Sequence, residues 1–303
     1  MARVLVTRRL PFPALDRLAA AHDVTVWEGD LPPEPDRLRE LVADAEGLLC
    51  LLTDRVDAAL LDAAPRLRAI AVYAVGTDNV DHAVTRARGI PVGNTPGVLT
   101  EATADLAFAL ILAAARRLSE GERAVRAGDW RTWEPAGWLG LELSGATLGI
   151  VGAGRIGQAV ARRAEGFGMT VLTSRPTPLE ELLERSDVVS LHVPLTDATR
   201  HLIDADALAR IKPGAILVNT ARGGVVDQVA LAQALRDGRL GAAALDVTDP
   251  EPLPPDDPLL DAPNLLVLPH VGSATHATRA RMADMAVDNL LAALAGEPMP
   301  HPA

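Results

Sequence analysis

Short apolar runs alternate with amphipathic stretches along the first hundred residues. Runs of mostly β-branched and aliphatic side chains predict strands at 4–6, 24–26, 48–51 and 70–72. Helical spacing of the apolar positions between them predicts helices at 14–21, 35–45 and 58–63. Strands that alternate with helices form βαβ units, so this part of the chain is predicted to build a parallel sheet.

A second series of alternating elements begins near residue 147. Its apolar runs are unbroken, which is typical of strands covered by helices on both faces. The predicted strands lie at 147–151, 170–173, 188–193, 215–219, 242–247 and 265–268. A helical run follows Gly157, and further helices are predicted at 179–185, 205–210, 228–237 and 277–295. The Pro- and Asp-rich stretch 249–263 is predicted to be a long functional loop.

A long helical stretch, 100–127, joins the two series. Its apolar face is broader than one intramolecular contact needs, so we expect it to serve a domain or subunit interface. The irregular stretch 128–138 holds three of the four tryptophans. These side chains are expected to lie either against a partner surface or in the core of their own domain.

Composition narrows the class of protein. A chain of 303 residues with 49% hydrophobic side chains is typical of a soluble globular protein with about two domains. The net charge of -11 argues against nucleic-acid binding. Cys50, the only cysteine, lies in an apolar run and is expected to be a buried, inert thiol. The longest apolar run, 106–115, is too short to span a membrane, and the N-terminus resembles a strand rather than a signal peptide, so a cytoplasmic location is expected. No metal site is predicted.

The motif Gly152-x-Gly154-x-x-Gly157 lies between an apolar strand and a helical run. That is the context in which such glycines bind a dinucleotide. Gly152 would allow a tight turn, Gly154 a close approach of the pyrophosphate, and Gly157 close packing of the helix on the strand. The N–H groups at the start of the helix would hold the phosphates.

Three chemically active side chains each follow the end of a predicted strand: Arg222, Glu251 and His270. In a parallel sheet these ends lie on one edge, the edge that also carries the glycine motif. Arg222 could bind a carboxylate and polarise the neighbouring carbonyl group. His270 could protonate the alkoxide, while Glu251 would fix one imidazole tautomer and, as an opposite charge, favour its protonated form. This set suits hydride transfer to a 2-keto acid, although each residue alone has an ordinary structural explanation.

The chain resembles the D-isomer-specific 2-hydroxyacid dehydrogenases over nearly its whole length. The resemblance rests on residues 75–81, 149–157, 187–194, 219–227, 246–252 and 270–275. It implies an α/β fold of two Rossmann-like domains, with a cofactor domain (98–271) inserted into a flavodoxin-like substrate domain (1–97 and 272–303). It also implies catalytic roles for Arg222, Glu251 and His270, and a homodimer formed through 100–127.

The resemblance further implies two sets of binding residues. The expected cofactor contacts are Val75, Gly152, Gly154, Arg155, Ile156, Gly157, Ser174, Arg175, Val193, Pro194, Thr220, Ala221, Arg222, Asp246, His270 and Gly272. The expected substrate contacts are Leu51, Val75, Gly76, Arg222, His270 and Trp138, the last reaching the partner subunit's active site. Residues 95–100 and 128–135 most resemble glyoxylate and hydroxypyruvate reductases.

The strand that follows the glycine motif, at 170–173, decides the expected cofactor. NAD-binding units usually place an acidic residue at its end, about 20 residues past the glycines, but this chain has Ser174 and Arg175 there. A guanidinium and a hydroxyl suit a 2′-phosphate, so NADP(H) is expected to be preferred and NAD(H) remains possible. Two alternatives stay open: a phosphoglycerate dehydrogenase-like enzyme of the same family, and a non-catalytic, dinucleotide-sensing corepressor.

Overall fold

The computed structural model describes residues 1–10 and 13–303. The chain forms two compact units, one of residues 1–99 with 273–303 and one of residues 100–272. It passes between the units after Leu99 and after Gly272, where the sequence suggested 97 and 271. Each unit contains one parallel sheet, so the expected α/β fold is confirmed.

The first unit has five parallel strands in the order β2-β1-β3-β4-β5. They are β1 (Arg3–Val6), β2 (Asp23–Val26), β3 (Gly47–Cys50), β4 (Ala69–Val72) and β5 (Val92–Gly93). This is the flavodoxin-like order, in which the direction of winding reverses between β1 and β3. Ligands bind at such a switch point, outside the carboxyl ends of the strands.

Helices cover both faces of the first sheet. They are α1 (Ala14–Ala21), α2 (Pro35–Val42), α3 (Ala58–Ala63), α4 (His82–Ala87) and α11 (His276–Leu294). Successive side chains of a strand point to opposite faces, so Leu48 and Cys50 of β3 pack together on the side of α2 and α3. The last helix, α11, contacts α1, β3 and β4. Cys50 is fully buried, as predicted, and burial raises the pKa of its thiol.

The second unit has six parallel strands in the order β11-β10-β9-β8-β6-β7. They are β6 (Thr147–Val151), β7 (Thr170–Thr173), β8 (Val188–Leu191), β9 (Ile216–Asn219), β10 (Ala242–Leu245) and β11 (Leu265–Val267). Here the winding reverses between β6 and β8. The glycine motif therefore follows the strand at the switch point, where an open α/β sheet binds its ligand.

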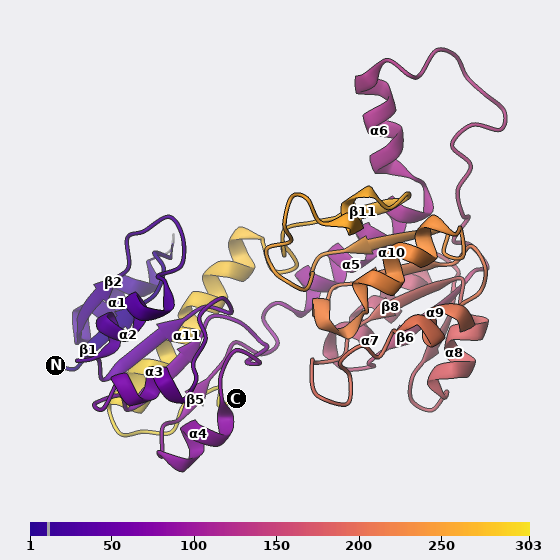
Figure 1. The fold of residues 1–303 in the computed structure, drawn as a ribbon. Helices are drawn as coiled ribbons and strands as arrows, with labels where there is room; N and C mark the ends of the chain where they lie inside the picture. The colour runs from indigo at the N-terminus through magenta and orange to yellow at the C-terminus, as the bar shows by residue number, and fades with distance from the viewer. Residues whose placement is uncertain (11–12) are drawn as a thin grey trace. The chain divides into compact units, whose positions relative to one another are not determined.

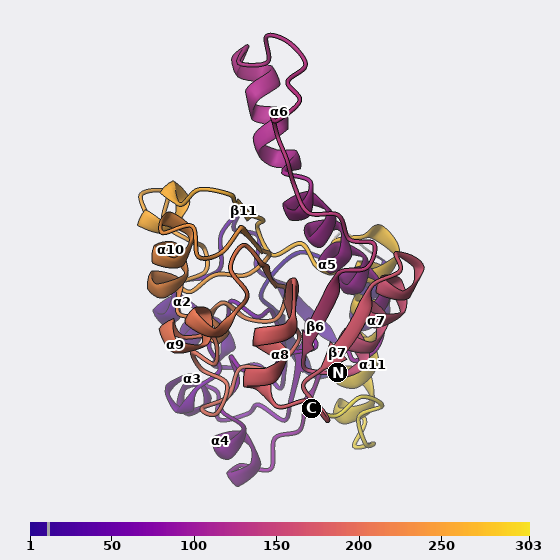
Figure 2. The same cartoon turned by 90° about the vertical axis from the view of Figure 1, so that its right-hand side faces the viewer.

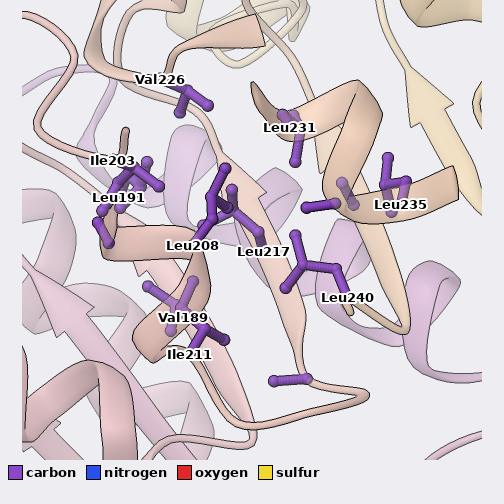
Figure 3. Close-up of a cluster of buried hydrophobic side chains, with 14 of the residues drawn as sticks. Val189, Leu191, Ile203, Leu208, Ile211, Leu217, Val226, Leu231, Leu235 and Leu240 are labelled. Carbon is purple, nitrogen blue, oxygen red and sulfur yellow. The ribbon is translucent and has the colours of Figure 1, made fainter. Parts of the chain in front are cut away.

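Two separate cores cover the faces of the second sheet. The helices are α5 (Thr100–Ala115), α6 (Leu118–Ala127), α7 (Arg155–Gly166), α8 (Leu179–Arg185), α9 (Ala205–Arg210) and α10 (Gln228–Arg236), with short 3-10 turns η1 (Gly223–Val225) and η2 (Pro258–Asp261). Ile216 and Val218 of β9 pack towards α5 and α7. Leu217 packs on the other face with Leu208 of α9 and Leu231 of α10 (Figure 3).

The predicted single helix over 100–127 is wrong, because it is interrupted. Arg117 adopts φ 52, in the left-handed region, and ends α5 before α6 begins at Leu118. The apolar face of α5 packs on α7, β9 and β10 of its own unit, which explains its breadth. The helix α6 and the segment after it extend away from the rest of the second unit (Figures 1 and 2).

The tryptophans of this segment do not fill the core of their own unit. Trp130, Trp133 and Trp138 are 61%, 78% and 47% exposed. Trp138 adopts φ 59 and lies 5.8 Å from the guanidinium carbon of Arg117, measured to the ring centroid. Of the two expectations for these side chains, burial in their own domain is therefore wrong.

Among the described residues, no helix is long and apolar enough to cross a membrane. The short helix α4 and the two-residue strand β5 were not anticipated, nor were the 3-10 turns η1 and η2.

Candidate active site

The turn between β6 and α7 has a backbone that excludes side chains at two glycines. Gly152 adopts φ +99, and a Cβ there would lie 2.6 Å from the carbonyl oxygen of His192. A Cβ at Gly157 would lie 2.2 Å from the carbonyl oxygen of Gly152. At Gly154, in contrast, no described residue other than its two chain neighbours comes within 4 Å of the Cβ position. The turn is thus tightly packed at Gly152 and Gly157 and open at Gly154.

The open side of this turn meets the start of α7. The first bond within the helix runs from the Gln158 N–H to the Gly154 carbonyl at 2.9 Å. The N–H groups of Arg155, Ile156 and Gly157 precede that bond, and such groups have no partner within their helix. Together with the positive end of the helix dipole they suit a pyrophosphate. The residues present therefore fit a bound dinucleotide.

The end of β7 is tied to the same turn. The Gly152 N–H donates to the Ser174 hydroxyl at 3.0 Å, and the Thr173 hydroxyl donates to the Arg175 carbonyl at 2.6 Å. Arg175 itself is exposed. Ser174 and Arg175 thus lie next to the glycine turn, at the strand end where a dinucleotide's adenosine ribose binds in this type of fold.

His270 and Glu251 form a pair. His270 Nδ1 lies 2.5 Å from Glu251 Oε1, and the two side chains are 24% and 32% exposed. They come from the segments after β11 and β10, on the edge predicted from the parallel sheet. With Nδ1 engaged by the carboxylate, Nε2 is the imidazole nitrogen left for a proton transfer.

A buried carboxylate holds the backbone after His270. His270 adopts φ 54, a left-handed conformation that costs a non-glycine residue about 1–3 kcal/mol. The N–H groups of Val271 and Gly272 donate to the Asp246 carboxylate at 2.7 and 2.8 Å. Burial raises the pKa of Asp246, while these two bonds act in the opposite direction. Asp246 therefore stabilises the turn that carries His270, and its predicted contact with the cofactor stays a prediction.

A buried asparagine shapes the turn that carries Arg222. The Ala221 N–H donates to Asn219 Oδ1 at 3.0 Å, and Asn219 Nδ2 donates to the Arg222 carbonyl at 2.9 Å. The Arg222 guanidinium donates to the Ala221 carbonyl at 2.8 Å. Asn219 was not predicted to have this role, although an amide at a strand end before a turn is a known turn signal.

His192 connects two strands at this edge. Its Nε2 lies 2.9 Å from the Ser190 hydroxyl and its Nδ1 lies 3.5 Å from the Thr220 hydroxyl. Burial lowers the pKa of His192 to about 4, so the ring is neutral near neutral pH. Val193 and Pro194 follow it directly, beside the glycine turn. Nothing in the residue pattern indicated this role, because His192 lies within a predicted strand.

The predicted substrate residues of the first unit lie at the carboxyl edge of its own sheet. The Leu51 N–H donates to the buried Asp54 carboxylate at 2.7 Å, and Asn79 Nδ2 donates to the Leu51 carbonyl at 3.0 Å. Asn94 Nδ2 donates to the Val75 carbonyl at 2.7 Å, and Gly76 follows, half-buried. These bonds fix the backbone of both loops. No cluster of described residues could hold a metal ion.

Known proteins match both the sequence and this architecture. The protein-family model for the D-isomer specific 2-hydroxyacid dehydrogenase NAD binding domain matches residues 108–272 of this chain. The chain belongs to this family. It is 51% identical to a glyoxylate reductase of Korarchaeum cryptofilum over 314 residues, covering 99% of this chain and 95% of that protein.

Two further relatives come from Homo sapiens and Sinorhizobium meliloti. The human glyoxylate reductase/hydroxypyruvate reductase is 45% identical, covering 99% of this chain and 97% of the relative. A crystal structure of an NADPH-dependent glyoxylate/hydroxypyruvate reductase from Sinorhizobium meliloti, in complex with NADP and malonate, is 35% identical. It has a TM-score of 0.89 and covers 100% of this chain and 96% of the other. Family membership identifies this chain as a nicotinamide dinucleotide-dependent oxidoreductase.

Proposed function

We propose that this protein reduces a small 2-keto acid, of the glyoxylate or hydroxypyruvate type, to the D-2-hydroxy acid. The observation that carries the proposal is the His270–Glu251 pair, which belongs to the same unit as the dinucleotide-binding turn. The relatives named above support the substrate class, and the family supports the D configuration. A carboxylate-paired imidazole beside a dinucleotide site suits carbonyl reduction better than a sensing role, for which no proton donor is needed.

Each polar residue has a distinct part in this reaction. A bound reduced nicotinamide supplies the hydride that the carbonyl carbon accepts. His270 Nε2 donates a proton to the carbonyl oxygen, while Glu251 fixes the ring through Nδ1. Arg222 binds the substrate carboxylate and polarises the adjacent carbonyl. Contacts of the substrate with Leu51, Val75, Gly76 and Trp138 stay predictions of the same proposal.

We further propose that NADP(H) is the preferred cofactor. Ser174 is held against the glycine turn through the Gly152 N–H, and the exposed Arg175 follows it. No acidic residue stands at this strand end to bind a 2′-hydroxyl or to repel a 2′-phosphate. A guanidinium at this place would form charge-assisted hydrogen bonds with the phosphate.

We also propose a homodimer. The exposed apolar side chains of the 100–127 region lie on α6, at Leu118 and Val125, and the exposed tryptophans follow in the next segment. An apolar, aromatic surface of this kind is typical of the centre of a protein–protein interface.

Steady-state assays with glyoxylate, hydroxypyruvate and pyruvate, each with NADPH and NADH, test the function and the cofactor together. We expect reduction of at least one of these acids, with the higher kcat/KM for NADPH. Arg175→Ala should reduce the NADPH preference about tenfold or more, since it removes charge-assisted bonds worth about 1.5–3 kcal/mol. Arg185→Ala, which removes an exposed arginine paired with Glu181, is the matched control and should leave the ratio unchanged.

Four results would contradict parts of the proposal. Absence of turnover with every acid in the panel would favour a sensing protein. Activity confined to a phosphorylated hydroxy acid would favour the phosphoglycerate dehydrogenase alternative. A preference for NADH would contradict the NADP(H) assignment. An NADPH preference that survives Arg175→Ala would contradict the role given to Arg175.

A further inference from the structure

Gln228, the first residue of α10, forms two hydrogen bonds with a single residue of the loop that carries Glu251. Its Nε2 donates to the Asp249 carbonyl at 2.5 Å, and the Asp249 N–H donates to its Oε1 at 2.8 Å. A side-chain amide that pairs with both the N–H and the C=O of one residue fixes the position and the orientation of that residue. Asp249 lies two residues before Glu251.

Few other polar contacts hold the loop at Asp249. A pocket of about 310 Å³ lies here, lined by Asp249 and Asp257 of the loop and by Gln228 and Val229 of α10. The additional bonds near Asp249 are the Thr248 hydroxyl to the Pro250 carbonyl at 2.8 Å and a long, exposed ion pair of Asp249 with Arg200 at 3.7 Å. Exposed ion pairs contribute little to stability.

The opposite side of the same backbone lies against the turn of Arg222. A Cβ at Gly223 would lie 2.0 Å from the carbonyl carbon of Thr248 and 2.5 Å from the Asp249 nitrogen. The Thr248–Asp249 peptide is thus enclosed between Gly223 and the Gln228 amide. Because Asp249 lies two residues before Glu251, the position of this peptide sets where the Glu251 carboxylate meets His270.

We propose that Gln228 is a positioning residue: its amide pair with Asp249 keeps Glu251 in register with His270 and Arg222. The inference rests on the proposed function only for its kinetic readout. Gln228 acts through Glu251 and needs no contact with substrate or cofactor.

Kinetics of graded variants test the proposal. Gln228→Met keeps the length of the side chain and removes both bonds, and we expect kcat for the best keto acid to fall about tenfold, less than the hundredfold that about 1 Å of misplacement can cost. Gln228→Glu keeps the acceptor for the Asp249 N–H and loses the donor. Its kcat should therefore lie between those of the wild type and Gln228→Met. Gln233→Met on the same helix removes only a bond with Asp237 and should behave as the wild type.

Two further measurements separate positioning from a loss of folding. In a Glu251→Gln background, Gln228→Met should change kcat by less than about twofold, because both substitutions act through one carboxylate. The proton on His270 Nδ1, observed by NMR of the unliganded protein, should broaden or disappear in Gln228→Met and persist in Gln233→Met. Losses that multiply in the double variant, or an unchanged Nδ1 proton signal, would overturn the proposal. A wild type without keto-acid turnover would overturn the proposed function, while the NMR comparison would still decide the role of Gln228.

Discussion

Acidification should destabilise this protein through one histidine. In the folded chain burial lowers the pKa of His192 to about 4, whereas an unfolded chain takes up the proton near the ordinary value of about 6.5. Between these values the unfolded state binds more protons than the folded state. The contribution of His192 to the free energy of unfolding therefore rises with pH across this window. The same contribution is lost as the pH falls through the window.

The size of the effect follows from the two pKa values. From about pH 7.5 to about pH 5 this single group should remove about 2 kcal/mol from the free energy of unfolding. His192→Gln gives the comparison, because an amide can still bond to the Ser190 or Thr220 hydroxyl but does not titrate. Carboxylates that titrate in the same range are common to both proteins and cancel in the difference.

Urea denaturation followed by circular dichroism measures this difference. The free energy of unfolding of the wild type minus that of His192→Gln should become smaller by about 2 kcal/mol at the lower pH. A difference that is equal at both pH values would show that protonation of His192 does not destabilise the folded protein. So would an NMR titration in which the His192 ring of the folded protein titrates at its ordinary pKa.

Three other substitutions test separate parts of the structure. Gly157→Ala places a Cβ 2.2 Å from the Gly152 oxygen and should raise the Kd for NADPH about tenfold or more. The control Gly166→Ala, with open space around its Cβ, should leave this Kd unchanged. Equal NADPH affinities of the two variants would contradict the role given to Gly157. Asp246→Asn leaves one backbone N–H after His270 without an acceptor and should lower the free energy of unfolding by about 1–3 kcal/mol in urea. Trp133→Ser should weaken the proposed dimer in analytical ultracentrifugation at micromolar concentration, and an unchanged dimer would place the interface elsewhere.

The fold was largely predictable because its parallel strands are covered on both faces. Their apolar runs are continuous, and the helices between them carry regular apolar spacing, so helices such as 179–185 and 205–210 were predicted with the bounds that the structure has. The break between α5 and α6 was not predictable, because Arg116 and Arg117 are good helix formers. Arg117 leaves the helix through tertiary contacts, with the Trp138 ring and with Asn264.

The placement of the reactive residues followed from topology alone. Glu251 and His270 each come after a parallel strand, which puts them on one edge, and the structure brings them to 2.5 Å. The roles of Asp246 and Gln228 in holding them were not visible in the sequence. Asp246 reaches the Val271 and Gly272 amides across 25 and 26 residues of chain, and Gln228 reaches Asp249 across 21. Such pairs depend on how loops far apart in the sequence lie side by side, and no local sequence pattern encodes that.

In the proposed reaction, His270 donates the proton during reduction of a 2-keto acid. The most direct test of this role is a comparison of kcat for glyoxylate with NADPH in the wild type and in His270→Ala, with the NADPH dissociation constant measured alongside. Loss of a general acid should lower kcat by about 10²–10⁴-fold while NADPH binding changes little. Near-normal turnover in His270→Ala would show that His270 is not the proton donor.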